Sequence, residues 1–320
     1  MSKTIASINT KLLVGALVLT LCACSESGAT GGNGSSASLA NDPAASVTVA
    51  AGSEFVSDSV GVQLRMPAGI TGSFDATGGT LFFGNPQNTL GGFIFGGSAG
   101  GVQAGASRAI RTLLPLLELE IAQVFDDSVN PDGSTSAQFG AVNAAGNQVF
   151  MHLNVHMGTS GNYIAILGNS MFNDQSELSS LITQMSGSVV FSAPAPATGL
   201  TNITGIVLEA NSSNTNFNGS GSTTGGDESF LVTCTDGRYR FASTSSFFIS
   251  FDGGAGASNT ESVEHEGMLA TQVDFAGNQL LSLHSFDQGT FVFNVTPNNG
   301  SIFLDQTPFQ QTGTSEQQCS

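Results

Sequence analysis

The sequence has few basic residues and no basic cluster. Seven lysines and arginines stand against 24 aspartates and glutamates in 320 residues, which gives a formal net charge of −17. Phosphate groups are bound by clustered lysines and arginines. The composition therefore excludes nucleic acid and anionic lipid headgroups as partners. Both lysines lie near the N-terminus, and the rest of the chain has these cations: Arg65, Arg108, Arg111, Arg238 and Arg240.

Long apolar runs are also lacking, apart from a short run near the N-terminus. Residues 12–21 are apolar, follow the positive charges of Lys3 and Lys11, and are too few for a stable membrane span. The run ends in Leu21-Cys22-Ala23-Cys24, a small-residue cleavage site followed by cysteine. This pattern predicts a signal peptide over residues 1–23. No later apolar run approaches 18 residues, so we expect no other segment to span a bilayer.

The segment around Cys24 resembles the lipobox of bacterial lipoproteins, whose cysteine is acylated after cleavage just before it. Cys22 does not match, because Leu21 before it is too large for the cleavage pocket. The resemblance implies a lasting membrane anchor, since each buried methylene of an acyl chain contributes about 0.8 kcal/mol. Ser25 at the next position implies the outer membrane of a Gram-negative cell, on its periplasmic or surface face. An ordinary secretory signal with a coincidental cysteine is the alternative.

Charged residues are sparse, while glycine, serine, threonine and asparagine are abundant around short clusters of valine, isoleucine and phenylalanine. This is typical of a β-rich exported protein with many turns. After cleavage, five arginines and 24 carboxylates give a formal charge of −19. The mature chain is longer than one core usually holds, so two domains are expected. We place a flexible tether at 24–45, a first domain at 46–192, a linker at 193–202 and a second domain at 203–320.

The cysteines lack the CxxC spacing that metal and redox sites use. Two of them, Cys234 and Cys319, remain after Cys22 is removed and Cys24 is acylated. An even pair in an oxidising compartment predicts a disulfide. It would fix the C-terminal tail and contribute about 2–4 kcal/mol.

The first domain mixes strands with two helices. One helix is expected over 102–114, ended or kinked by Pro115, and a second begins at Asn173 or Asp174 with Glu177 as a capping-box partner. The order of elements predicts an α+β antiparallel sandwich with two helices. It resembles the PsbP/Mog1-like domains at residues 61–70 and 163–192, which implies a binding and assembly module. The expected strands are 46–50, 60–66, 80–83, 91–95, 121–126, 134–142, 148–156, 163–168 and 188–192.

The second domain has no helical pattern and about eight closely spaced strands. Turn signals such as Asp236-Gly237 and Asn298-Asn299-Gly300 separate them, which predicts an all-β antiparallel barrel or sandwich. The start, Cys234-Thr235-Asp236-Gly237-Arg238-Tyr239, resembles that of small lipocalin-like barrels, although Met268 stands where their tryptophan is found. The expected strands are 203–209, 228–234, 237–242, 246–251, 262–275, 278–286, 289–295 and 301–305.

One stretch has the letters of a catalytic motif: Gly96-Gly97-Ser98-Ala99-Gly100 matches G-x-S-x-G. A serine hydrolase using Ser98 is therefore an alternative, and Asp126, Asp127, His152 and His156 follow in a suitable order. Such an enzyme needs a parallel sheet with helical crossovers, whereas the short turns between residues 121 and 168 require antiparallel strands. We interpret the stretch as a glycine-rich bend with Ser98 as a helix cap. Neither GxGxxG nor a GK[ST] ending occurs, so no phosphate loop is expected.

The remaining candidates are histidines and carboxylates on strands. His152 and His156 would share the outer face of a strand about 13 Å apart, too far to share a metal, so we interpret them as a surface pair. Glu264, His265 and Glu266 are interpreted as a solvated strand. We therefore expect no catalytic residue, no metal and no cofactor.

These observations together predict a non-catalytic, membrane-anchored lipoprotein of the cell envelope. The barrel-like second domain favours binding of an apolar small molecule, and the absence of a catalytic constellation leaves an envelope protein as the other expected partner.

Overall fold

The computed structural model describes residues 37–38, 47–116, 119–130, 133–143, 146–218, 221–251, 256–316 and 318–319. The chain divides into two units, Met1–Asn33 and Gly34–Ser320, of which the second is compact. The predicted signal peptide and Cys24 lie outside the described residues, as does most of the predicted tether. All of the described helices and strands belong to the second unit.

The fold is mostly β, with a β-sheet N-terminal part, two helices and a closed C-terminal barrel. The larger sheet has eight strands in the order β2-β5-β6-β7-β11-β10-β9-β8, and all neighbours are antiparallel. Its strands are β2 (Val47–Val49), β5 (Thr71–Asp75), β6 (Thr80–Gly84), β7 (Leu90–Gly97), β8 (Leu119–Val129), β9 (Thr135–Asn143), β10 (Gln148–Met157) and β11 (Tyr163–Met171).

A smaller sheet of four strands has the order β1-β3-β4-β12. It comprises β1 (Ala37–Ser38), β3 (Glu54–Ser57), β4 (Val62–Arg65) and β12 (Val190–Phe191). The strand β1 lies within the predicted tether and pairs in parallel with β3. The sequence pattern also missed β3 and β5, which are short and interrupted by polar residues.

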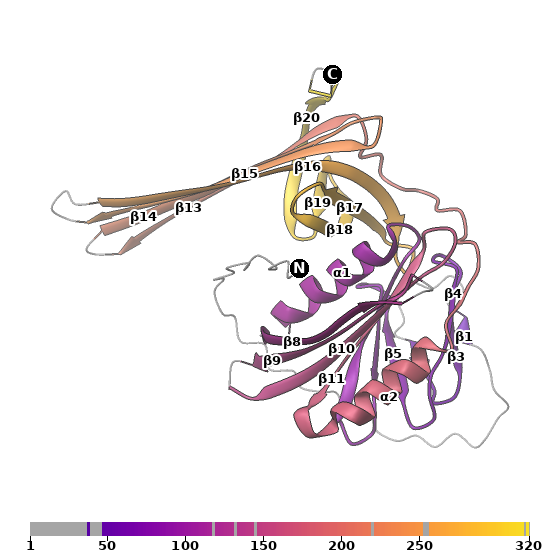
Figure 1. Cartoon of the computed structure of the whole chain (residues 1–320). Helices are drawn as coiled ribbons and strands as arrows, with labels where there is room; N and C mark the ends of the chain where they lie inside the picture. Colours follow the sequence, from indigo (N-terminus) through magenta and orange to yellow (C-terminus); the bar gives the residue numbers. More distant parts are fainter. Residues whose placement is uncertain are drawn as a thin grey trace. The chain divides into compact units, whose positions relative to one another are not determined.

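The two helices cover opposite faces of the larger sheet (Figure 1). Helix α1 (Gly101–Leu116) packs Ala106 and Ala109 against Met151, and helix α2 (Gln175–Ser186) packs Leu178 against the face that carries Ile166. Helix α1 ends one residue after Pro115, as expected from proline chemistry. The strand β10 is therefore buried on both of its faces.

The predicted capping box of the second helix is wrong. A short 3-10 helix, η1 (Phe172–Asp174), precedes α2, and Asp174 at the N-cap position makes no side-chain capping hydrogen bond. Its φ of −102° and ψ of 11° continue the turn of η1, whereas a capping side chain normally requires an extended backbone.

The C-terminal part is a closed antiparallel barrel, which decides between the two predicted architectures. The predicted strands 237–242 and 246–251 are one continuous strand, because Ser243, Thr244 and Ser245 pair with residues on both sides. An eighth strand after residue 305 was missed. The barrel strands are β13 (Ile206–Asn218), β14 (Gly221–Thr233), β15 (Arg238–Phe251), β16 (Gly256–Val273), β17 (Gln279–Ser285), β18 (Gly289–Asn298), β19 (Ser301–Leu304) and β20 (Thr307–Thr314).

Four of these strands are longer than the barrel requires. The strand β20 pairs with β13 only from Ile206 to Glu209, and β17 pairs with β16 only from Gly267 to Val273. Pairing within β13, β14, β15 and β16 nevertheless continues to their far ends. Beyond Glu209 of β13 and before Gly267 of β16, these four strands form an antiparallel extension, which we call the ribbon (Figure 1).

Candidate functional site

The barrel strands bury a set of apolar side chains. Leucine, isoleucine, valine and aromatic residues from strands around the barrel form a single buried cluster. Interior positions of small barrels are commonly filled in this way. The buried members are Ile203, Ile206, Leu208, Ala210, Leu231, Tyr239, Leu281, Leu283, Val295, Ile302, Leu304 and Phe309.

A polar pair lies within this apolar cluster. The Tyr239 hydroxyl lies 2.9 Å from Nδ1 of His265, and the His265 ring stacks on Phe291 with ring centroids 4.7 Å apart. Burial raises the pKa of Tyr239 to about 12, against the opposing effect of a hydrogen bond with Ser285. His265 is 9% exposed, whereas Glu264 and Glu266 on either side of it are exposed. The solvated-strand prediction is therefore wrong for His265, because alternate residues of β16 face the barrel interior.

Ser98 joins the sheet to the barrel through two hydrogen bonds with Val273. Its amide donates to the Val273 carbonyl, and the Val273 amide donates to its hydroxyl oxygen, each at 2.9 Å. In the described part of the chain, no histidine or carboxylate is hydrogen-bonded to this hydroxyl. Helix α1 begins only at Gly101, so the hydroxyl contacts β16 and does not cap the helix.

The glycines beside Ser98 are required by close packing. A Cβ atom on Gly96 would collide with the Phe275 ring, and one on Gly97 would collide with the Gln272 amide oxygen and the Tyr163 ring. Glycine permits such close approach because it has no side chain. The match to G-x-S-x-G is therefore explained by close packing of Gly96 and Gly97 against Phe275 and Gln272.

A buried ion pair crosses the same contact. Arg108 of α1 is 6% exposed, and its Nη2 lies 3.4 Å from Oδ2 of Asp274, which is fully buried. The guanidinium also donates to the Gly96 carbonyl at 2.8 Å and lies over the Phe95 ring, 5.4 Å from its centroid. Burial raises the pKa of Asp274, and the charge of Arg108 opposes this effect. We call the region in which Gly96, Ser98 and Arg108 meet Val273 and Asp274 the junction.

Two more buried polar groups lie at the junction. The Tyr163 hydroxyl and the Gln272 Oε1 atom are buried without a hydrogen-bond partner among the described residues. Burial raises the pKa of Tyr163, while nearby Arg108 acts in the opposite direction. Sequence reasoning missed these groups along with Arg108 and Asp274. The available signal was Arg108, a rare cation inside an otherwise apolar helical pattern.

The turn after β16 inserts into the core of the N-terminal part. The Phe275 ring packs edge-on against Phe55 with centroids 5.1 Å apart, and the Ser57 hydroxyl donates to the Phe275 carbonyl at 3.1 Å. Asn278 donates to the carbonyls of Ala76 and Thr77. Phe275 is thus a member of the first hydrophobic cluster, and Ala276 packs against it.

His152 and His156 are not a surface pair. His152 is 3% exposed and its Nε2 lies 3.1 Å from the Ser136 hydroxyl, while Nδ1 has no partner among the described residues; His156 is half-buried. The prediction of an outer face is wrong because α2 covers that side of β10, where Asn154 donates to Ser186. Burial lowers the pKa of His152, with Asp126 opposing. Over the described ranges, no group of three or more potential ligands could hold a metal.

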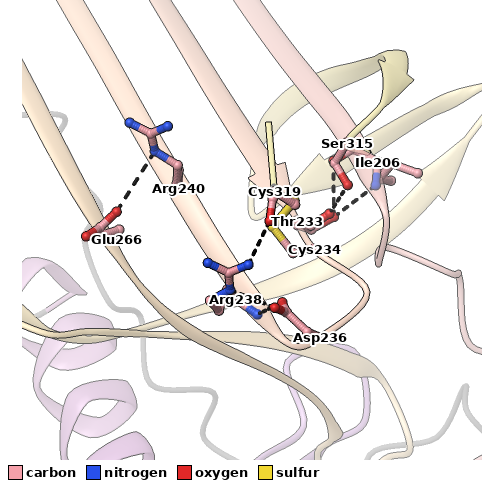
Figure 2. The surroundings of a disulfide bond; sticks show 9 residues. All are labelled: Ile206, Thr233, Cys234, Asp236, Arg238, Arg240, Glu266, Ser315 and Cys319. Atoms are coloured by element: carbon pink, nitrogen blue, oxygen red, sulfur yellow. Dashed lines mark hydrogen bonds and ion pairs between the residues drawn. A yellow bond between two sulfur atoms is a disulfide. The ribbon is translucent and has the colours of Figure 1, made fainter. Parts of the chain in front are cut away.

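The predicted disulfide is present, and its Cys234 directly follows β14 (Figure 2). The sulfur atoms of Cys234 and Cys319 are bonded, with Cα atoms 5.8 Å apart, and join positions separated by 85 residues. Arg238 donates to the Cys319 carbonyl at 2.7 Å, and the Ser315 hydroxyl donates to the Thr233 carbonyl at 2.7 Å. The C-terminal tail is therefore held by both covalent and polar contacts.

Comparisons with known proteins add no further information on this site. No protein-family model, curated protein or solved structure matches the chain. Among the described residues, no helix is long and apolar enough to cross a membrane.

Proposed function

We propose that the chain is a non-catalytic, membrane-anchored lipoprotein of the cell envelope that binds an envelope protein partner. The observation that carries this proposal is the single buried apolar cluster of the barrel strands. Ligand-binding barrels enclose a cavity, whereas here Leu208, Leu281 and Leu283 belong to one buried cluster inside the strands. A protein partner on the surface is therefore favoured over an apolar small molecule inside.

The state of Ser98 supports the non-catalytic part of the proposal. A nucleophilic serine needs a base within hydrogen-bond reach, and the Ser98 hydroxyl instead accepts from the Val273 amide. The anchoring part rests on the lipobox pattern at Cys24.

A fluorescent fatty acid titration tests whether the barrel binds an apolar small molecule. We expect no saturable binding by the wild-type chain. A Leu283→Ala variant titrated with benzene is the matched control, because removing a buried leucine side chain opens an apolar cavity that admits a molecule of that size. Saturable, stoichiometric binding by the wild-type chain would contradict the proposal and favour an apolar small molecule as the ligand.

Two labelling experiments test the other parts. A fluorophosphonate probe should give no labelling that depends on Ser98, and Ser98→Ala is the control; Ser98-dependent labelling overturns the non-catalytic proposal. Radiolabelled palmitate should enter the wild-type chain and the Cys22→Ala variant but not the Cys24→Ala variant. Acylation that survives Cys24→Ala would contradict the proposed anchor.

A further inference from the structure

The ribbon has an open edge along β13. The strand β14 pairs with β13 out to Asn218, while β20 leaves it after Glu209. Among the residues that the structure describes, no strand pairs with the other side of β13 from Asn211 to Asn218. A strand edge exposes a row of backbone amides and carbonyls that can pair with another strand. The ribbon therefore offers the eight consecutive residues Asn211–Asn218 for such pairing.

This edge lacks the usual features that prevent pairing. Natural edges are protected by charged residues, prolines or bulges. From Ala210 to Asn218 the sequence has neither charge nor proline, and the irregularity in β13 pairing lies earlier, between Val207 and Leu208. The opposite strand of the ribbon, β16, differs because it carries the exposed carboxylates of Glu261 and Glu264.

The charge pattern favours a second copy of this chain on the β13 edge. The chain is strongly acidic, so two copies repel each other wherever carboxylates meet. The carboxylates beside the β13 edge are Glu209, two residues before Asn211 on β13 itself, and Asp227 and Glu228, which pair on β14 with Ser212 and Asn211. They therefore lie beside one end of the eight-residue edge.

A two-fold axis keeps these charges apart. Antiparallel pairing of two β13 strands over their full overlap places Asn211 opposite Asn218 and Asn214 opposite Thr215. The acidic ends then lie at opposite ends of the seam, about 24 Å apart for seven residues. That distance exceeds the screening length of about 8 Å at physiological salt.

We propose that two copies of the chain associate through antiparallel pairing of β13 with β13, which joins two ribbons into one sheet of eight strands. The contact is isologous, with the same edge used by both copies. Because the seam is uncharged and the two bodies are acidic, salt strengthens the association by screening the repulsion.

Sedimentation of the full-length chain in mild detergent tests this pairing at low and high salt. The test variant is Asn214→Asp with Thr215→Asp, which places like charges directly opposite each other in the seam. It should weaken the dimer about tenfold or more. The control is Asn259→Asp with Thr260→Asp, the same charge change on β16, which should dimerise like the wild type.

A mixing experiment separates a lost contact from a damaged fold. Combining the Asn214→Asp, Thr215→Asp chain with an Asn214→Lys, Thr215→Lys chain should restore dimers, because opposite charges then face each other. The proposal is overturned if the wild type stays monomeric at high salt, if both aspartate variants dimerise equally, or if salt weakens the association.

Discussion

At the scale of single residues, the glycines of the junction show how a catalytic-looking string can arise from packing. Gly96, Gly97 and Gly79 each lie where a Cβ atom would collide with a barrel residue. Glycine-rich segments are a common signal of active-site loops, yet the same composition serves close approach of two surfaces. A glycine of an active-site loop lies beside open space for a ligand, whereas a glycine required by packing lies beside another part of the chain.

Gly96→Ala is expected to destabilise the protein by about 1–3 kcal/mol, because the added methyl group must displace the Phe275 ring in a packed core. Chemical denaturation measures the change. Gly313→Ala is the matched control, since no atom lies within 4 Å of its Cβ position. Equal effects of the two substitutions would show that the contact between Gly96 and Phe275 is not tight.

His152 gives a pH dependence whose sign follows from its burial. Its pKa in the folded chain is below the ordinary value of 6.5, so below that pH the unfolded chain binds more protons than the folded one. The free energy of unfolding should therefore fall as pH drops from 6.5 through the lowered pKa, by up to about 1.4 kcal/mol per unit. Denaturation of wild type and His152→Gln across this range checks it: the variant should lose the dependence. Parallel curves would contradict the prediction.

At the scale of elements, local patterns predicted most strands and both helices but not their surroundings. The alternation of residues 148–156 indicates a strand, and β10 occupies that range. The alternation does not reveal that α2 covers the second face, because the covering residues, such as Leu178, lie farther along the chain. In the same way, Ser243 to Ser245 resemble a turn, but pairing on both sides keeps them in β15.

The junction could not be predicted from local patterns at all. Arg108 and Asp274 are separated by 166 positions, and neither sits in a motif. The disulfide was predictable because only two cysteines remained to pair. The number of cysteines was thus enough to predict the disulfide, whereas the ion pair of Arg108 and Asp274 depends on packing between distant parts of the chain, which the sequence does not show.

The disulfide stabilises the last barrel strand, β20, and the tail after it. Reduction, or a Cys234→Ala and Cys319→Ala double variant, should lower the free energy of unfolding by about 2–4 kcal/mol, because the bond restricts a long loop in the unfolded chain. Denaturation with and without reductant measures the effect. The double variant must be insensitive to reductant, and a wild-type chain that is equally insensitive would contradict the prediction.

At the scale of the whole molecule, the junction is expected to make the sheet and the barrel unfold together. Phe275 supplies part of the N-terminal core, so the barrel cannot open at that turn without exposing Phe55 and Phe74. The chain has no tryptophan and only two tyrosines, Tyr163 in the sheet and Tyr239 in the barrel. Each tyrosine therefore reports on one part.

Tyr163→Phe and Tyr239→Phe variants should show coincident unfolding when each is followed by its remaining tyrosine. Adding Phe275→Ala removes a large buried side chain, costing about 3–5 kcal/mol, and should separate the two transitions. Phe286→Ala, at a side chain that is 66% exposed, is the control and should leave them coincident. Separate transitions without Phe275→Ala would show that the two parts unfold independently.

The insertion of Phe275 also affects the order in which the protein is made. The Ser57 hydroxyl and the Phe275 carbonyl that it contacts are 218 positions apart. A chain that emerges from its N-terminus first must therefore wait for most of its length before the first core can close. During that interval, apolar residues such as Phe55 and Phe74 lack the packing that Phe275 supplies, so we expect the nascent chain to be prone to aggregation.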